Sequence, residues 1–254
     1  MPGHRDDGGD GGNGRDAVLK ALEQGILERL AAVRQRIADA CARAGRDPDS
    51  VTLIGVTKTH PPEVVEAAVR CGLLDLGENY AQELVSKAAR LPPGVEPRWH
   101  FIGHLQTNKV RLVSGLVRSV HSVDRLSLVE ELARRVPKTG TTLDIYVEVA
   151  IAGEAQKSGA PPDQVEAICR RVLEVQGLHL SGLMCVPPLC DDKEASRPYF
   201  KALRDLRDHL IRTIRPPAGC LGGLSMGMSH DLDVAVEEGA TVVRVGTALF
   251  GPRG

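Results

Sequence analysis

Short apolar segments alternate with amphipathic segments along most of this chain. The first apolar run, VTLIGVTK at 51–58, is rich in β-branched residues and predicts a buried strand. PPEVVEAAVRCG at 61–72 follows, with apolar residues at helical spacing, prolines at its start and a glycine at its end, which is typical of a helix. The same alternation continues to residue 251. Seven further strands are predicted at 73–79, 99–105, 117–124, 143–151, 178–186, 221–227 and 241–251.

Eight apolar strands that alternate with helices predict a parallel sheet. Eight in succession favour a closed α/β barrel of the (β/α)8 TIM type. An open doubly wound sheet is the alternative, because the strands at 117–124 and 221–227 are ambiguous. No helix is predicted after the last strand, and we expect the amphipathic N-terminal helix that begins near residue 17 to fill part of that gap. We therefore expect one barrel domain over 17–254.

Composition excludes several classes of protein. The segment 1–16 is rich in Gly and Asp, cannot bury an apolar face and predicts a disordered tail. It lacks the order of a signal peptide, and no apolar run is long enough to cross a bilayer. A net charge of −1 without a basic stripe argues against nucleic acid or a membrane as a partner. The six scattered cysteines form no CxxC pair and no zinc set, so we expect reduced thiols, a cytoplasmic protein and no metal site.

Polar residues gather where the strands end, which is where such barrels build their sites. Lys58 ends the first strand. A lysine there either extends its amine to solvent or is desolvated, which lowers its pKa and suits Schiff-base chemistry with a carbonyl. Arg244 lies within the last strand, and a buried cation needs a partner. The other polar residues expected at this mouth are Glu78, Asn79, His100, His104, Ser122, Asp124, Ser225 and Thr247.

The loops after the last two strands are candidates for binding phosphate, as in many barrels. Ser225 lies before the first loop, and Ser229 is the predicted N-cap of the next helix. Gly246 lets the backbone approach a ligand, and Thr247 supplies a hydroxyl. No nucleotide-binding glycine motif is present. A reactive lysine and a phosphate cradle at one mouth suit pyridoxal 5′-phosphate (PLP), or a phosphosugar in a Schiff-base aldolase.

Three long segments resemble the YggS/PROSC family of pyridoxal phosphate homeostasis proteins: GENYAQE, WHFIGHLQTNK and LSMGMSHDLDVAVEEGATVVRVGTALFG. The similarity runs from about residue 51 to residue 251. It implies a single barrel of the alanine-racemase type, with PLP held on Lys58 as an internal aldimine. It also implies that Arg244 faces the pyridine nitrogen and that Asn79 lies near the cofactor. The phosphate ligands implied by the resemblance are Ser225, Gly246 and Thr247.

The resemblance implies a carrier that holds, buffers and delivers PLP, with apo-PLP enzymes as candidate recipients and without a dedicated turnover reaction. A PLP-dependent racemase or decarboxylase is the alternative, and it needs a second acid–base group on the other face of the cofactor. In relatives, a second domain or a partner subunit helps to complete that site, and we expect none after the last strand. We expect Tyr146 to pack in the core, and His100 and His104 to be core or loop residues rather than catalytic bases. We therefore assign no catalytic residue and expect a monomer.

Overall fold

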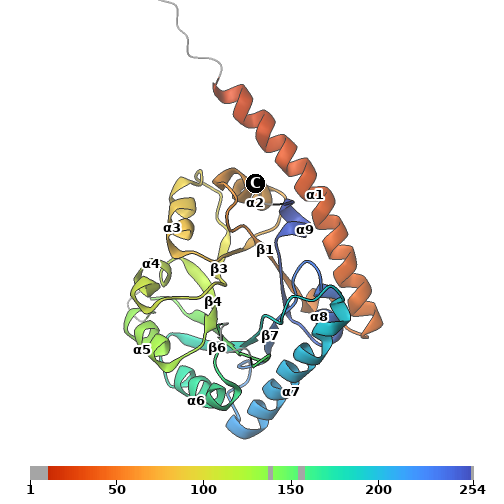
Figure 1. Ribbon diagram of the computed structural model, residues 1–254. Coiled ribbons are helices and arrows are strands. Elements are labelled where there is room, and N and C mark those ends of the chain that lie inside the picture. Colours follow the sequence, from red (N-terminus) through yellow and green to blue (C-terminus); the bar gives the residue numbers. More distant parts are fainter. Residues whose placement is uncertain (1–10, 137–139, 154–157, 253–254) are drawn as a thin grey trace, which may run out of the picture.

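A closed barrel of eight parallel strands forms the centre of the molecule (Figure 1). The computed structural model describes residues 11–136, 140–153 and 158–252. The barrel closes where the last strand pairs with the first, so every strand has two neighbours. This confirms the predicted barrel and excludes the open sheet. The strands are β1 (Thr52–Val56), β2 (Asp75–Glu78), β3 (Arg98–Phe101), β4 (Val117–Val123), β5 (Leu143–Glu148), β6 (Leu178–Met184), β7 (Gly223–Ser225) and β8 (Val242–Val245).

Helices surround the barrel in chain order (Figure 1). The first helix after a strand begins with Pro62 at a position where the missing N–H is harmless, and Gly72 follows its end with φ of 77°. The helices are α1 (Gly11–Arg43), α2 (Pro62–Arg70), α3 (Ala81–Arg90), α4 (Val110–Val113), α5 (Leu126–Arg135), α6 (Pro162–Leu173), α7 (Arg197–Ile214), α8 (Leu232–Glu237) and α9 (Thr247–Phe250).

The main hydrophobic core joins the strands to the surrounding helices. Strand residues such as Leu76 and Ile145 are fully buried in the same cluster as Leu84 of α3 and Leu132 of α5. Each such side chain contributes roughly 1.5–3 kcal/mol of transfer free energy when it is buried. The apolar faces read from the sequence therefore act as the contact surfaces between the sheet and the helices.

Helix α1 takes the place beside the last strand that a longer final helix would cover. It packs against α2, α8 and α9, as Figure 1 shows. Its buried residues Leu30, Val33 and Ile37 join the main core. Within the described part of the chain only the four-residue helix α9 follows β8. The predicted role of the N-terminal helix in filling this gap is therefore confirmed.

The start of α1 differs from the sequence prediction. The helix begins at Gly11, so the residues from 11 to 16, predicted as tail, are helical. Residues 1–10, the rest of that predicted tail, lie outside the described residues. Leu19 is 2% exposed and packs in one cluster with Ile26, Val64 and Ala67. Extending a nucleated helix costs far less than starting one, and this explains the earlier start.

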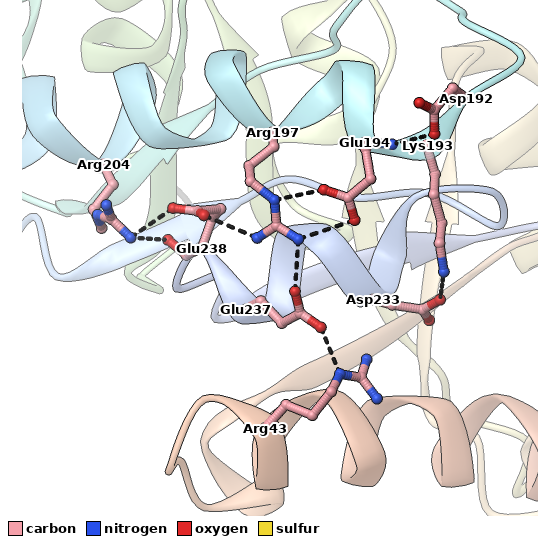
Figure 2. A network of polar contacts seen from close by, with 9 residues as sticks. All are labelled: Arg43, Asp192, Lys193, Glu194, Arg197, Arg204, Asp233, Glu237 and Glu238. Atoms are coloured by element: carbon pink, nitrogen blue, oxygen red, sulfur yellow. Dashed lines mark hydrogen bonds and ion pairs between the residues drawn. The ribbon is translucent and has the colours of Figure 1, made fainter.

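Ion pairs fasten α1 and α7 to α8 (Figure 2). Glu237 of α8 accepts hydrogen bonds from Arg43 of α1 over 2.6 Å and from Arg197 of α7 over 2.7 Å. Arg197 also pairs with Glu238 at 3.0 Å. The hydrogen bonds from Arg197 and Arg43 lower the pKa of Glu237. Exposed ion pairs contribute little singly, but a carboxylate shared by two arginines links three helices.

The six cysteines all lie in the described part of the chain and form no disulfide. Burial raises the pKa of both Cys169 and Cys185 to about 12, so these thiols stay protonated at neutral pH. They act as small apolar residues of the core. Over the described ranges, no helix has the length and apolar character needed to span a membrane.

Candidate functional site

Lys58 lies two residues beyond β1, at the carboxyl end of the barrel, and is half-buried. On one side, the pairing of Val56 with Gly77 places Lys58 level with Asn79 after β2. On the other side, β1 pairs with β8, which leads into Gly246. Lys58 therefore stands between two segments that the sequence analysis assigned to the same site.

Asn79 is held by a close backbone contact from the next loop. A Cβ atom at Gly103 would come within 2.4 Å of the Asn79 carbonyl oxygen, so only glycine fits after β3. A pocket of about 430 Å³ opens beside Asn79, bounded by Tyr80, His104 and Lys109. His104 is half-exposed and lies 3.5 Å from a carboxylate oxygen of Asp124. This confirms the loop position predicted for His104.

Three buried polar atoms in the described ranges have no hydrogen-bond partner, and all belong to the carboxyl half of the barrel. They are Glu78 Oε2 at the end of β2, Asn79 Oδ1 in the next residue and Ser122 Oγ near the end of β4. Buried polar atoms almost always have a partner, in the protein or in water. Orphaned acceptors and a hydroxyl at this end of the barrel fit a bound polar ligand. In the same ranges, no group of three His, Cys, Asp or Glu side chains is arranged to hold a metal.

Beside Lys58, a buried cluster centres on Glu78. Glu78 Oε1 accepts from Thr57 Oγ1 over 2.7 Å and from Lys87 Nζ over 2.6 Å. Burial raises the pKa of Glu78, while the hydrogen bonds from Lys87 and Thr57 oppose that rise. The sequence analysis missed Lys87. The available signal was its position on the apolar face of α3, three residues after Leu84.

Arg244 is 5% exposed and projects into the barrel interior. Its Nη1 donates to Ser225 Oγ over 2.6 Å, and its Nη2 donates to the carbonyl oxygen of Cys185 over 2.9 Å. Burial lowers the pKa of Arg244, and the partial charges of its acceptors offset the loss of hydration. Ser225 is fully buried, so its hydroxyl lies against Arg244 rather than in the loop that follows.

The loop after β7 turns sharply to bring Ser229 near the start of α9. Gly227 has φ of 93°, and a Cβ atom there would lie 2.5 Å from the Cβ atom of Ala235. Ser229 Oγ accepts from the Ala248 N–H over 3.3 Å. The predicted N-cap role of Ser229 is wrong. Helix α8 begins only at Leu232, because the loop continues for two more residues beyond Ser229.

Helix α1 reaches this loop directly. Arg36 Nη1 donates to the Ser229 carbonyl oxygen over 2.9 Å, and Arg36 Nε donates to Asp233 Oδ1 over 3.0 Å. Asp233 also pairs with Lys193 at 2.9 Å, which connects α8 to the segment after β6 (Figure 2). Arg36 thus holds the loop at Ser229, and Arg36 and Lys193 together hold the first turn of α8 at Asp233.

A chain of hydrogen bonds continues from Ser225 through the barrel interior. His121 Nδ1 lies 2.8 Å from Ser225 Oγ, and His121 Nε2 lies 2.7 Å from Ser119 Oγ. Ser119 Oγ lies 2.6 Å from His100 Nδ1, and His100 Nε2 lies 2.9 Å from Asp75 Oδ1. Asp75 is the first residue of β2, so the chain ends at the amino ends of the strands.

A buried cation and a carboxylate lie at the two ends of this chain. Burial alone raises the pKa of Asp75, but hydrogen bonds from His100 and Arg98 lower it to about 2. Asp75 is therefore ionised at neutral pH and accepts from His100 Nε2. At the other end, Arg244 donates to Ser225. The polar chain through the barrel interior thus links a guanidinium to a carboxylate.

His100 and Tyr146 both line the interior at the amino end of the barrel. His100 was expected at the mouth, but its contact with Asp75 places it toward the opposite end of the barrel. That expectation is wrong, because the ring of His100 turns to Ser119 and to Asp75, the first residue of β2. Tyr146 stacks on His121 with ring centroids 4.3 Å apart, which confirms its predicted packing role. Both rings line a pocket of about 280 Å³ at the amino end.

The chain is similar to known proteins over most of its length. The family model described as alanine racemase, N-terminal domain, matches residues 29–254. The pyridoxal phosphate homeostasis protein of Aquifex aeolicus is 45% identical over 226 residues, which cover 89% of this chain and 97% of that protein. The protein of the same name from Pseudomonas aeruginosa is 42% identical over 228 residues, covering 90% and 96%.

The structure of PipY from Synechococcus elongatus with PLP bound is similar as well. It has a TM-score of 0.77 and 34% sequence identity, and the match covers 89% of this chain and 100% of PipY. The family match, the relatives and the barrel agree over almost the same span of residues. The chain belongs to the alanine racemase N-terminal domain family and, within it, to the pyridoxal phosphate homeostasis proteins.

Proposed function

We propose that this protein binds PLP through Lys58 and carries it for intracellular PLP homeostasis. The observation that carries the proposal is the match to PipY, whose structure has PLP bound, over 89% of this chain. The orphaned polar atoms of Glu78, Asn79 and Ser122 support it, since they fit a polar ligand at the same end of the barrel. When bound, PLP supplies an aldehyde that condenses reversibly with a primary amine and releases one water.

In this proposal each side chain at the mouth has one role. Lys58 provides the amine, and Asn79 lines the cofactor site. Arg244 faces the pyridine nitrogen. An arginine cannot give up its proton, so it disfavours a protonated ring and weakens the ring as an electron sink. That property suits holding the cofactor better than turning over a substrate.

The phosphate is assigned to Gly246 and Thr247 after β8, together with Ser229. Ser229 is half-buried and reaches the same segment through its contact with the Ala248 N–H. Ser225 was the serine expected from the sequence, but its hydroxyl is fully buried between Arg244 and His121. We therefore propose that Ser225 supports Arg244 and that Ser229 takes the phosphate.

We propose that the protein is a carrier without a dedicated turnover reaction. The relatives are named homeostasis proteins, and no such name states a substrate. A racemase or decarboxylase needs an acid–base group on the second face of the cofactor. His104, a histidine of the mouth, has 51% of its side chain exposed and lies beside Asp124. Apo-PLP enzymes in the cytoplasm are the proposed recipients, and the carrier is proposed to act as a monomer.

The test is a spectrum and a chemical trap. Protein mixed with PLP is expected to gain visible absorbance, and borohydride is expected to fix the cofactor on Lys58, located by peptide mass spectrometry. Lys58→Ala should lose both signals, while the control Lys201→Ala, at an exposed position of α7, should keep them. An adduct that persists elsewhere in Lys58→Ala contradicts the assignment.

The same preparation separates carrier from enzyme. Amino acids are screened for racemisation and decarboxylation with the loaded protein. Turnover near the typical enzyme rate of about 10 s⁻¹ overturns the carrier reading. A trapped phosphosugar adduct without PLP absorbance supports the aldolase alternative instead.

A further inference from the structure

We propose that Lys87 is a positioning residue for Lys58. This inference rests on the proposed function, because it concerns how the PLP-binding amine is held. Lys87 lies on α3, and its side chain is 4% exposed. It reaches the backbone on both sides of Lys58, directly on one side and through Glu83 on the other.

The ammonium group of Lys87 makes two hydrogen bonds and one further ion pair. Its Nζ lies 2.6 Å from the Thr57 carbonyl oxygen, 2.6 Å from Glu78 Oε1 and 2.7 Å from Glu83 Oε1. A buried ammonium group engaged by these three partners is a poor nucleophile. This separates the role of Lys87 from that of Lys58.

Both residues that flank Lys58 are fixed by this group. Thr57 precedes it, and the Thr57 carbonyl oxygen accepts directly from Lys87. Thr59 follows it, and the Thr59 N–H donates to Glu83 Oε1 over 2.6 Å, the same oxygen that pairs with Lys87. Lys87 therefore holds the backbone on both sides of Lys58, directly at Thr57 and through Glu83 at Thr59.

The conformation of Thr59 shows why the turn needs such support. Thr59 has φ of 67°, a left-handed conformation that is unfavourable for a β-branched residue. Strain of this kind persists only where the surrounding contacts enforce it. The hydrogen bond to Glu83 enforces it here, and Glu83 is itself anchored by Lys87.

Electrostatics make Lys87 indispensable to the cluster. Glu78 is fully buried and Glu83 is partly buried, and the charge of Glu83 raises the pKa of Glu78. Without the ammonium between them, the two carboxylates repel each other and Glu78 favours its protonated form. Glu83 then loses the cation that holds it near Thr59, and the turn that carries Lys58 can relax.

The experiment measures PLP affinity by absorbance titration, at a temperature well below the melting point of each variant. Lys87→Met keeps the length of the side chain and removes its charge. Removal of a hydrogen-bonded buried charge predicts PLP binding weaker by roughly tenfold or more. Lys201→Met, at an exposed position, is the matched control and should bind as the wild type does.

Two further variants test the path through the turn. Glu83→Gln keeps an acceptor for the Thr59 N–H but removes the charge, so a smaller loss of affinity is expected. Thr59→Gly in the Lys87→Met background should recover part of the affinity, because glycine adopts a positive φ without strain. Such a rescue is not expected if Lys87 only stabilises the fold.

Unchanged PLP affinity in Lys87→Met, with only a lower melting temperature, overturns the proposal. If Lys87→Met does not fold, Glu83→Gln decides: weaker binding supports the positioning role, and wild-type affinity overturns it. Failure of the proposed function looks different, because the wild-type protein itself then forms no borohydride-fixed adduct on Lys58.

Discussion

Arg244 and Ser225 are joined by a hydrogen bond of 2.6 Å from Nη1 to Oγ, inside the barrel and out of reach of solvent. The same serine hydroxyl lies 2.8 Å from His121 Nδ1. Ser225 therefore connects Arg244, the cation proposed to face the cofactor ring, to the chain of polar side chains that begins at His121 and ends at Asp75. Ser225 is therefore the fully buried serine of the LSMGMS segment, whereas Ser229 is only half-buried.

Replacing Ser225 and Ser229 one at a time should show which serine contributes to the stability of the fold and which contributes to PLP affinity. Ser225→Ala leaves the buried Nη1 of Arg244 without its acceptor and should lower the free energy of unfolding by about 1.5–3 kcal/mol. Ser229→Ala should weaken PLP binding more than Ser225→Ala while costing less stability, since Ser229 is only half-buried. Denaturant unfolding and PLP titration measure the two effects. The opposite ranking for PLP would return the phosphate to Ser225.

His121 should make the fold sensitive to mild acid. Burial, together with the nearby charges of His100 and Arg244, lowers the pKa of His121 well below its usual value. The unfolded chain binds a proton there below about pH 6.5 and the folded chain does not, so stability falls as the pH drops below that value. One such group adds a slope of up to about 1.4 kcal/mol per pH unit.

His121→Gln should therefore flatten the dependence of unfolding free energy on pH between about 4 and 6. His209→Gln, at an exposed position of α7, is the control and should leave the slope unchanged. Denaturant titrations at a series of pH values give both slopes. Equal slopes for wild type and His121→Gln would mean that His121 takes up a proton in the folded protein.

Arg36 should couple α1 to ligand binding. Arg36→Met removes the hydrogen bonds to the Ser229 carbonyl and to Asp233, and it should cost about 1 kcal/mol because the side chain is one-third exposed. Binding of PLP should weaken as well, since the Ser229 loop loses its anchor. Arg34→Met removes an exposed arginine from the same helix and serves as the control. Wild-type affinity in Arg36→Met would show that the loop holds its shape without α1.

Gly227 should tolerate no side chain. Its positive φ disfavours alanine, and the new Cβ atom would clash with Ala235 at 2.5 Å, so Gly227→Ala should cost about 2–4 kcal/mol. Gly219 also has a positive φ, 87°, but no atom within 4 Å of an added Cβ. Gly219→Ala therefore isolates the backbone cost and should be the milder change. Ala235→Gly should partly rescue Gly227→Ala by removing the clash.

The barrel could be predicted from the sequence because its signals are local. Each strand is a short apolar run, and each helix carries its own periodicity and end signals, as in the segment from Pro62 to Gly72. Even β7, only three residues long, could be predicted, because strands and helices alternate along the chain and a strand was expected between two helices. The mouth residues Lys58, Asn79 and Gly246 followed from the rule that strand ends build the site.

The interior could not be predicted in the same way. Strands of a closed barrel are buried on both faces, so their sequences do not show which residues point inward. The contact between His121 and Ser225 joins residues 104 positions apart, and no local pattern indicates it. Lys87 was missed for the same reason, since its acceptors lie on two other segments. The only sequence signal for these interior contacts was the presence of polar residues, such as Lys87, at positions where the pattern predicts a buried apolar residue.

The position of α1 has a consequence for how the protein is made. This helix is translated before every other described element, yet its partners α8 and α9 follow seven of the eight strands. During synthesis, the apolar face that carries Leu30, Val33 and Ile37 therefore has no complete surface to dock against until β8 has left the ribosome.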